Sequence, residues 1–191
     1  FDDCLKAAQN FCQEQGAHFL SPFDDADVIE GQASVAVEIE RQLGSTPDHI
    51  ILPVGGGGLS SGMLSYFGTS SQFTLVEPLG GACLWAALIA GKPVKLDKVD
   101  TFADGAAVGQ IGQRTFECLR SIGLANVLRI PEDRICITML EMLNIEGIVL
   151  EPAGALAIDA LQDLGQMIRG RKVVCVSSGG NFDFERLPEV K

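Results

Sequence analysis

The chain of 191 residues is long enough for one good-sized domain, or for one domain and part of another. Its 47% hydrophobic and 20% charged residues are typical of a globular core and exclude a disordered chain. A net charge of −11 without a basic stripe argues against a nucleic-acid partner, and no apolar run is long enough to span a bilayer. Because the first residue is Phe1 and no secretory signal opens the chain, we expect a processed protein or a fragment without its upstream part.

Apolar residues at helical spacing alternate along the chain with short apolar runs. We predict helices over residues 3–15, 35–43, 59–67, 82–90, 112–122, 132–144 and 152–164, and strands over 17–20, 49–54, 73–76, 126–130 and 173–176. Buried strands that alternate with helices indicate an α/β fold. We expect a mostly parallel, twisted sheet with helices on both faces.

Four consecutive glycines, Gly55–Gly58, separate the predicted strand 49–54 from the predicted helix 59–67. Without Cβ atoms, such a loop can adopt positive φ and turn several N–H groups toward an anion at a helix N-terminus. A flexible linker is the alternative, but in a linker the glycines would be interspersed with serines, and a linker would not follow directly after an apolar strand. The loop therefore predicts phosphate binding without saying which phosphate.

A second strand, residues 173–176, also runs into small polar residues, Ser177–Asn181. In open parallel sheets, ligands bind beyond the carboxyl ends of the strands. Two glycine-rich strand ends in one sheet are therefore expected to border a single ligand from two sides.

The two histidines and six cysteines give little support for metal or nucleophilic chemistry. There is no CxxC pair and no HExxH motif, and His49 follows Pro47-Asp48, which predicts a solvated loop histidine. The cysteines lie mostly among apolar neighbours, and we expect buried, reduced thiols in a cytoplasmic protein.

A nicotinamide-binding loop and a nucleotide P-loop are the rival interpretations of the glycines. Glu77 ends the next strand, where a ribose-binding acid belongs. However, G-x-G-x-x-G fails in both registers, because Ser60 and Ser61 stand where its last glycine is needed. The P-loop pattern fails because no Lys-Ser/Thr pair follows the glycines. A non-catalytic phosphate- or dinucleotide-binding module remains the alternative of a different class.

Several segments of the sequence resemble the motifs of threonine dehydratases and occur in the same order as in that family. Threonine dehydratases are fold-type II pyridoxal-phosphate enzymes, related in fold to the tryptophan synthase β subunit. Four of these segments are Val54-Gly55-Gly56-Gly57-Gly58-Leu59, Phe102-Ala103-Asp104-Gly105, Glu151-Pro152-Ala153-Gly154-Ala155-Leu156 and Ser178-Gly179-Gly180-Asn181. Pro22-Phe23-Asp24-Asp25 and Val28-Ile29-x-Gly31-Gln32 also resemble the family's pattern. The resemblance runs along essentially the whole chain.

The resemblance implies pyridoxal 5'-phosphate as cofactor and assigns roles to matching residues. The backbone N–H groups of Gly55, Gly56, Gly57, Gly58 and Leu59 would hold the phosphate. Ser178 would hydrogen-bond the pyridine nitrogen. Asp104-Gly105 and Glu151 would line the pocket. Each has an equally good structural interpretation: Asp104 as a turn residue and Glu151 as a carboxylate at a helix N-terminus.

Two residues bear on a metal site. In related dehydratases and serine racemase, an acid like Glu77 begins a divalent-metal site that a second carboxylate six residues further on completes. Here Cys83 stands at that second position, and we therefore predict no metal and a structural Glu77.

The family's Schiff-base lysine lies in an N-terminal Ser-Phe-Lys-x-Arg-Gly motif that this sequence lacks. The chain is thus expected to be the C-terminal part of a catalytic domain, with no catalytic residue of its own and no dehydratase activity alone. Residues 1–21 would be the tail end of the small, cofactor-closing domain, and 22–191 the large pyridoxal-phosphate domain. We expect these residues to include no part of the regulatory domain that follows the catalytic domain in some family members.

By resemblance, the parent enzyme would convert L-threonine, and L-serine, to a 2-oxo acid and ammonia on the route to isoleucine. Serine dehydratase or serine racemase activity is the alternative within the family, since a pocket distinguishes a methyl group by only about 1–3 kcal/mol. The full-length protein is expected to be a cytoplasmic homo-oligomer.

Overall fold

The computed structural model describes residues 2–183 and residue 185. Its helices are α1 (Asp2–Gln15), α2 (Ala26–Gln32), α3 (Ser34–Leu43), α4 (Gly58–Phe67), α5 (Cys83–Ala90), α6 (Gln113–Leu119), α7 (Glu132–Glu141), α8 (Pro152–Asp159) and α9 (Leu161–Leu164). Its strands are β1 (His49–Pro53), β2 (Gln72–Pro78), β3 (Val127–Ile130) and β4 (Val173–Cys175). Within the described residues, no helix combines the length and apolar character that crossing a bilayer requires.

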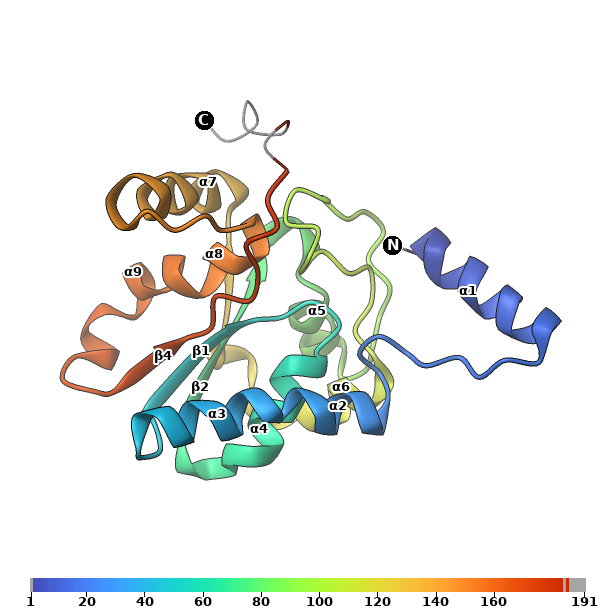
Figure 1. Ribbon diagram of the computed structural model, residues 1–191, viewed down its shortest axis with the longest axis horizontal. Coiled ribbons are helices and arrows are strands. Elements are labelled where there is room, and N and C mark those ends of the chain that lie inside the picture. The colour runs from blue at the N-terminus through green and yellow to red at the C-terminus, as the bar shows by residue number, and fades with distance from the viewer. Residues whose placement is uncertain (1, 184, 186–191) are drawn as a thin grey trace.

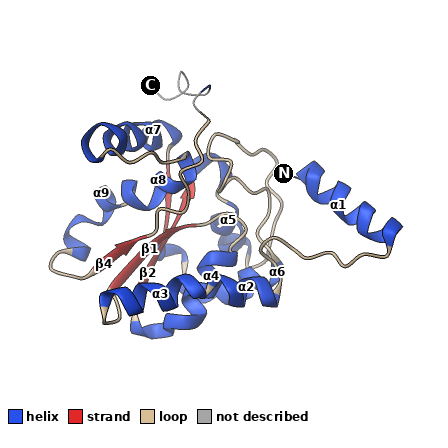
Figure 2. Cartoon of the chain, viewed as in Figure 1, coloured by secondary structure: helices blue, strands red, loops and turns tan. Residues whose placement is uncertain are grey.

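The four strands form one parallel sheet in the order β3-β2-β1-β4 (Figures 1 and 2). Ile51 in β1 is in register with Thr74 in β2 and with Cys175 in β4. Because every strand runs the same way, all four carboxyl ends lie at one edge of the sheet. The predicted α/β fold with a parallel sheet is confirmed.

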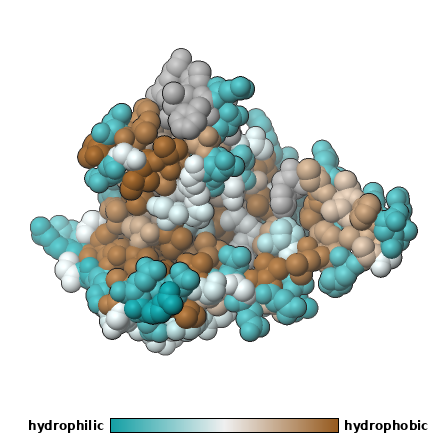
Figure 3. Space-filling model, in the orientation of Figure 1, coloured by the Kyte–Doolittle hydropathy of each residue, from teal (hydrophilic) through white to brown (hydrophobic). Residues whose placement is uncertain are grey.

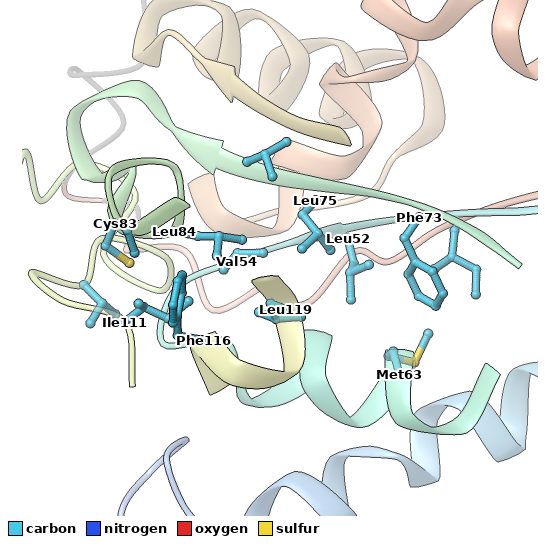
Figure 4. Close-up of a cluster of buried hydrophobic side chains, with 14 of the residues drawn as sticks. Leu52, Val54, Met63, Phe73, Leu75, Cys83, Leu84, Ile111, Phe116 and Leu119 are labelled. Atoms are coloured by element: carbon cyan, nitrogen blue, oxygen red, sulfur yellow. The ribbon is translucent and has the colours of Figure 1, made fainter. Parts of the chain in front are cut away.

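Successive residues of β1 point to opposite faces of the sheet, and each face has its own core. Ile50 and Leu52 pack with Met63 of α4 and with Phe116 and Leu119 of α6 (Figure 4). Ile51 instead packs with apolar residues of α7 and α8. Helices therefore cover both faces, which explains why all five residues of β1 are buried.

Helix α2 is a feature that the sequence did not predict. Gly62 of α4 allows α2 to cross it closely, since a Cβ on Gly62 would lie 2.6 Å from the Ile29 carbonyl oxygen and 2.7 Å from the Ala33 nitrogen. Apolar periodicity over seven residues is too short to mark such a helix, and no residue of α2 is buried.

Three predictions, about residues 17–20, His49 and the cysteines, were wrong or only partly right. Residues 17–20 form no strand, because they run as a connection beside α1 without a neighbouring strand, and Leu20 is 56% exposed. His49 is not solvated: it begins β1 and is 2% exposed, with its Nε2 2.8 Å from Thr74 Oγ1. All six cysteines are free, but Cys4 is exposed and only Cys83 and Cys136 are buried.

Two predicted helices of the second half are interrupted. The helix expected over 132–144 ends as α7 at Glu141 and continues as a π-helical turn, Met142–Glu146. The helix expected over 152–164 breaks at Ala160 into α8 and α9. The other predicted helices and strands match to within a few residues, the ordinary uncertainty of element ends.

An ion pair between a buried aspartate, Asp159, and a partly exposed arginine, Arg134, joins α7 to α8. The carboxylate of Asp159 is 0% exposed and accepts hydrogen bonds from Arg134 Nη2 at 2.6 Å and from Thr138 Oγ1 at 2.8 Å. The same guanidinium reaches Asp163 at 2.8 Å, at a more exposed position.

Replacing Asp159 by alanine should lower the free energy of unfolding by about 3 kcal/mol, because it leaves a buried hydroxyl and part of a guanidinium without their acceptor. Asp163→Ala, the matched control on the same arginine, should cost less than about 1 kcal/mol. Urea denaturation of the two variants beside the wild type measures both values. Equal losses would show that the buried pair is not the stronger link.

Candidate functional site

The glycine loop, Gly55–Gly58, leaves the carboxyl end of β1 and enters the first turn of α4. Gly57 has a φ of +90°, a left-handed conformation that favours glycine, and precedes the helix as its N-cap. Ser61 N–H donates to the Gly57 carbonyl at 2.9 Å and makes the first bond of the helix. The N–H groups before Ser61 are consequently free of helical partners.

The backbone N–H groups of the loop are the main chemical feature of the site. Among the described residues, none accepts a hydrogen bond from the N–H of Gly55, Gly56 or Gly57. Gly56, Gly57 and Gly58 are also buried. Buried amides without acceptors, at the positive end of a helix dipole, form an anion site.

Close neighbours explain why side chains are excluded from this loop. A Cβ on Gly56 would overlap the ring of Phe23. A Cβ on Gly57 would lie 2.9 Å from the Cβ of Thr115, in a backbone conformation that already disfavours other residues. The loop is therefore confined between the segment that contains Phe23 and the helix that contains Thr115.

A cavity of about 240 Å³ opens beside the glycine loop. Its lining includes seven of the eight predicted site residues, namely Gly55, Gly56, Gly57, Gly58, Leu59, Gly105 and Ser178. Pro22, Phe23, Gln32, Pro53, Ser60 and Ala106 complete it. Since β1 and β4 are neighbours, their two glycine-rich ends do border one cavity, as the sequence predicted.

Glu151, the eighth predicted residue, lies beside the cavity without lining it. It is the N-cap of α8, and its N–H donates to the Gly179 carbonyl at 3.2 Å. A Cβ on Gly105 would lie 3.0 Å from Glu151 Oε1, and a Cβ on Gly179 would overlap the carboxylate. The carboxylate thus fills the space between the Gly105 turn and the segment after β4, next to Ser178.

Glu77 is fully buried behind the glycine loop. Its two carboxylate oxygens accept the N–H groups of Leu84 at 2.7 Å and Trp85 at 2.9 Å, at the start of α5. Burial raises the pKa of Glu77 to about 7, opposed by these two N–H groups, by a hydrogen bond with Cys83 and by the charge of Arg129. This geometry supports a structural role, and it leaves no free carboxylate for a ribose.

Cys83 contacts the glycine loop directly. Burial, and the neighbouring Glu77 carboxylate, raise the pKa of its thiol, so that the thiol remains protonated. Its Sγ donates to the Gly55 carbonyl at 3.4 Å. The residue that interrupts the family's metal pattern is therefore part of the support of the loop.

A larger cavity, of about 820 Å³, lies at the opposite edge of the sheet, where His49 and Gln72 begin β1 and β2. It contains none of the predicted site residues. Burial and the nearby Arg171 lower the pKa of His49, although a hydrogen bond with Gln72 opposes this.

Sequence reasoning did not assign a role to Phe23, Asp24 or Thr115, which all lie against the glycine loop or its support. Phe23 and Asp24 had a signal, because they belong to a segment that resembles the family's pattern. Thr115 had none, since a threonine in a short amphipathic helix is unremarkable in sequence.

Comparison with known families and sequences places this site among known proteins. The family model described as pyridoxal-phosphate dependent enzyme matches residues 1–179. The biosynthetic L-threonine dehydratase IlvA of Bacillus subtilis (strain 168) is 43% identical over 100% of this chain and 46% of its own length. The same enzyme of Mycobacterium leprae (strain TN) is 41% identical over 100% of this chain and 45% of its own length. The chain thus spans less than half the length of these curated relatives.

Solved structures of pyridoxal-phosphate dependent enzymes are also similar to this chain. The processed form of threonine deaminase isoform 2 from Solanum lycopersicum has a TM-score of 0.88 and 34% identity, over 97% of this chain and 55% of that one. Serine racemase from Dictyostelium discoideum has a TM-score of 0.79 and 29% identity, over 93% of this chain and 58% of that one.

The raised pKa of Glu77 predicts a specific dependence of stability on pH. Between about pH 4.5 and pH 7, the unfolded carboxyl loses its proton while the folded one keeps it, so stability falls as the pH rises and levels off above 7. The loss amounts to about 3 kcal/mol. Glu77→Gln should remove this loss, whereas Glu132→Gln, which removes another carboxylate that accepts a backbone N–H, should retain it.

Urea denaturation of the three proteins at several pH values between 4 and 8 measures this effect. The difference in unfolding free energy between Glu77→Gln and the wild type should shift in favour of the variant across this range. Parallel pH profiles for the two proteins would contradict the shifted pKa.

Proposed function

Because the chain belongs to the pyridoxal-phosphate dependent enzymes, we propose that its glycine loop holds the phosphate of that cofactor and that the complete gene product is a threonine dehydratase. The observation that carries this proposal is the set of N–H groups of Gly55, Gly56 and Gly57, which have no acceptor among the described residues and belong to glycines that line one cavity with Ser178. The proposed reaction converts L-threonine to 2-oxobutanoate and ammonia.

The residues present fit the cofactor. The N–H groups of Gly55, Gly56 and Gly57, with those of Gly58 and Leu59 in the first helical turn, supply donors for a phosphate without any side-chain cation. Ser178 is exposed at the other side of the same cavity and offers a hydroxyl to the ring nitrogen. Glu151 keeps the Gly105 turn and the Gly179 segment in place.

Bound pyridoxal phosphate acts as an electron sink that makes the Cα–H of an amino acid acidic. Ser178 sets how strong this sink is. A serine hydroxyl is too weak an acid to protonate a pyridine nitrogen, whereas an aspartate would keep it protonated. Ser178 therefore favours elimination of the β-hydroxyl over side reactions such as transamination.

The base that removes the Cα proton is the part of the machinery that these residues do not supply. No lysine is among the residues that line the cavity in the described part of the chain. Since the chain spans less than half of its relatives, we propose that the lysine bound to the cofactor belongs to polypeptide outside these 191 residues. The chain alone would then be inactive.

The surroundings of the site fit a larger enzyme. Helix α1 projects away from the sheet and its helices (Figure 1), which supports assigning residues 1–21 to the end of a small domain and 22–191 to the large domain. Apolar side chains gather on the surface around α7 (Figure 3). Ile137 of α7 is 52% exposed, and Ile145 of the π-helical turn that follows is 74% exposed. A homo-oligomer would cover such a surface.

Serine dehydratase or serine racemase activity is the second candidate, favoured by the similarity to a solved serine racemase. Similarity to biosynthetic enzymes supports the threonine reaction and a place in isoleucine synthesis. The six free cysteines fit a cytoplasmic enzyme.

The complete gene product with pyridoxal phosphate should release 2-oxobutanoate from L-threonine, measured with a lactate dehydrogenase-coupled assay. Its kcat/KM for threonine should exceed that for serine by a factor of about 10, the worth of one well-placed methyl group. A protein that acts on serine alone, or that racemises it, would contradict the threonine assignment.

Exchanging Ser178 for aspartate should change the absorbance spectrum of the bound cofactor and increase transamination relative to elimination, because an aspartate protonates the ring nitrogen. Ser178→Ala is the control, since it removes the hydroxyl without adding a charge. Spectra and product ratios are measured on the complete gene product. An unchanged spectrum and product ratio in the aspartate variant would exclude contact between residue 178 and the ring.

A further inference from the structure

The carbonyl groups of the glycine loop are held by side chains that do not line the cavity. Thr115 Oγ1 donates to the Gly56 carbonyl at 2.8 Å, and Cys83 Sγ donates to the Gly55 carbonyl at 3.4 Å. Thr115 is 0% exposed, and neither side chain is among those lining the cavity. The loop is thus fixed from behind.

A hydrogen bond to a carbonyl of the loop also fixes the direction of the N–H group in the same peptide. In a planar trans peptide, the C=O of one residue and the N–H of the next point in opposite directions. When Thr115 holds the Gly56 carbonyl, it fixes the direction of the Gly57 N–H, one of the amides without an acceptor in the described chain. The Cys83 thiol, which is also hydrogen-bonded to Glu77, makes a weaker contact of this kind with the Gly55 carbonyl.

Thr115 also limits the position of the loop by contact. A Cβ on Gly57 would lie 2.9 Å from the Thr115 Cβ, so the threonine lies directly against this glycine. The Thr115 hydroxyl is 3.3 Å from the Gly112 carbonyl, a longer distance than that to Gly56. The single hydrogen of the Thr115 hydroxyl is therefore closer to its acceptor in the glycine loop, the Gly56 carbonyl, than to the Gly112 carbonyl.

Asp24 holds the first turn of α6, from which Thr115 extends. Its carboxylate accepts the N–H groups of Gln113 at 3.0 Å, Arg114 at 2.8 Å and Thr115 at 3.2 Å. A Cβ on Gly112 would overlap this carboxylate. The neighbouring Phe23 ring packs against Gly56, so one short segment supports the glycine loop and the helix behind it.

We propose that Thr115 is a positioning residue for the phosphate cradle, by which we mean the backbone N–H groups of Gly55–Gly58 and Leu59. Its hydroxyl orients the Gly56–Gly57 peptide so that the Gly57 N–H faces the cofactor phosphate. Asp24 fixes the helix α6, on which Thr115 lies. This inference rests on the proposed role of the glycine loop. It distinguishes Thr115 from buried threonines that only stabilise the fold, such as Thr138, whose hydroxyl donates to Asp159.

The test compares three variants of the complete gene product: Thr115→Val, which keeps the shape and removes the hydroxyl, Thr115→Ser, which keeps the hydroxyl, and Thr138→Val as a control for loss of a buried hydroxyl elsewhere. Dissociation constants are measured by fluorescence titration for pyridoxal 5'-phosphate and for pyridoxal, which lacks the phosphate. Urea midpoints are recorded for the same samples.

Thr115→Val should weaken binding of pyridoxal phosphate about tenfold, the worth of one hydrogen bond to the cradle, and should leave pyridoxal binding within about twofold of the wild type. Thr115→Ser should restore tight binding, and Thr138→Val should lower only the urea midpoint. Equal weakening of both ligands by Thr115→Val, or no weakening of either, would overturn the positioning role. A wild type that does not prefer pyridoxal phosphate to pyridoxal would instead contradict the cradle itself.

Discussion

The site depends on one constraint: a run of backbone N–H groups must face the same cavity without a protein acceptor. Amides in the interior of a protein normally find a carbonyl partner, and leaving them unpaired costs free energy. Here Cys83 and Thr115 hold the carbonyls of Gly55 and Gly56. Among the described residues, none accepts a hydrogen bond from the N–H groups of Gly55, Gly56 and Gly57. An anion in the cavity would satisfy the N–H groups, and folding and ligand binding are thereby linked.

The parallel sheet makes this arrangement possible. Because β1 and β4 are adjacent and parallel, the glycine loop and the Ser178 segment leave the same edge side by side. Buried cores on both faces fix β1, so the loop starts from a rigid point; Figure 4 shows the core on the face covered by α4 and α6. Three segments distant in sequence then meet at the loop, Phe23 on the side of the cavity and Cys83 and Thr115 on the side away from it.

Sequence patterns were enough to predict the elements whose signal is local. The apolar run before the four glycines and the helix after them predicted β1, the loop and α4, and the family's motifs selected the residues around the cavity. They failed where tertiary contacts decide. The turn formers before His49 predict a loop at this position. Its backbone nevertheless pairs with Gln72 of β2 and Val173 of β4, which places it in the sheet, and its ring is hydrogen-bonded to Thr74. The strand expected at 17–20 had apolar residues but no neighbouring strand.

The supporting residues were beyond prediction for the same reason. Asp24 caps a helix about 90 residues further along the chain, and no periodicity links positions so far apart. Glu151 was expected to line the pocket, but its carboxylate is enclosed between Gly105 and Gly179, as only the folded arrangement of three loops reveals.

A crystal structure of the complete gene product with pyridoxal phosphate would show directly whether the glycine loop binds the phosphate through its backbone N–H groups. We expect phosphate oxygens at hydrogen-bonding distance, about 2.7–3.2 Å, from the backbone nitrogens of Gly55–Gly58 and Leu59, with the Thr115 hydroxyl still donating to the Gly56 carbonyl. A phosphate bound mainly by lysine or arginine side chains, or bound in the cavity near His49 at the other edge of the sheet, would contradict this expectation.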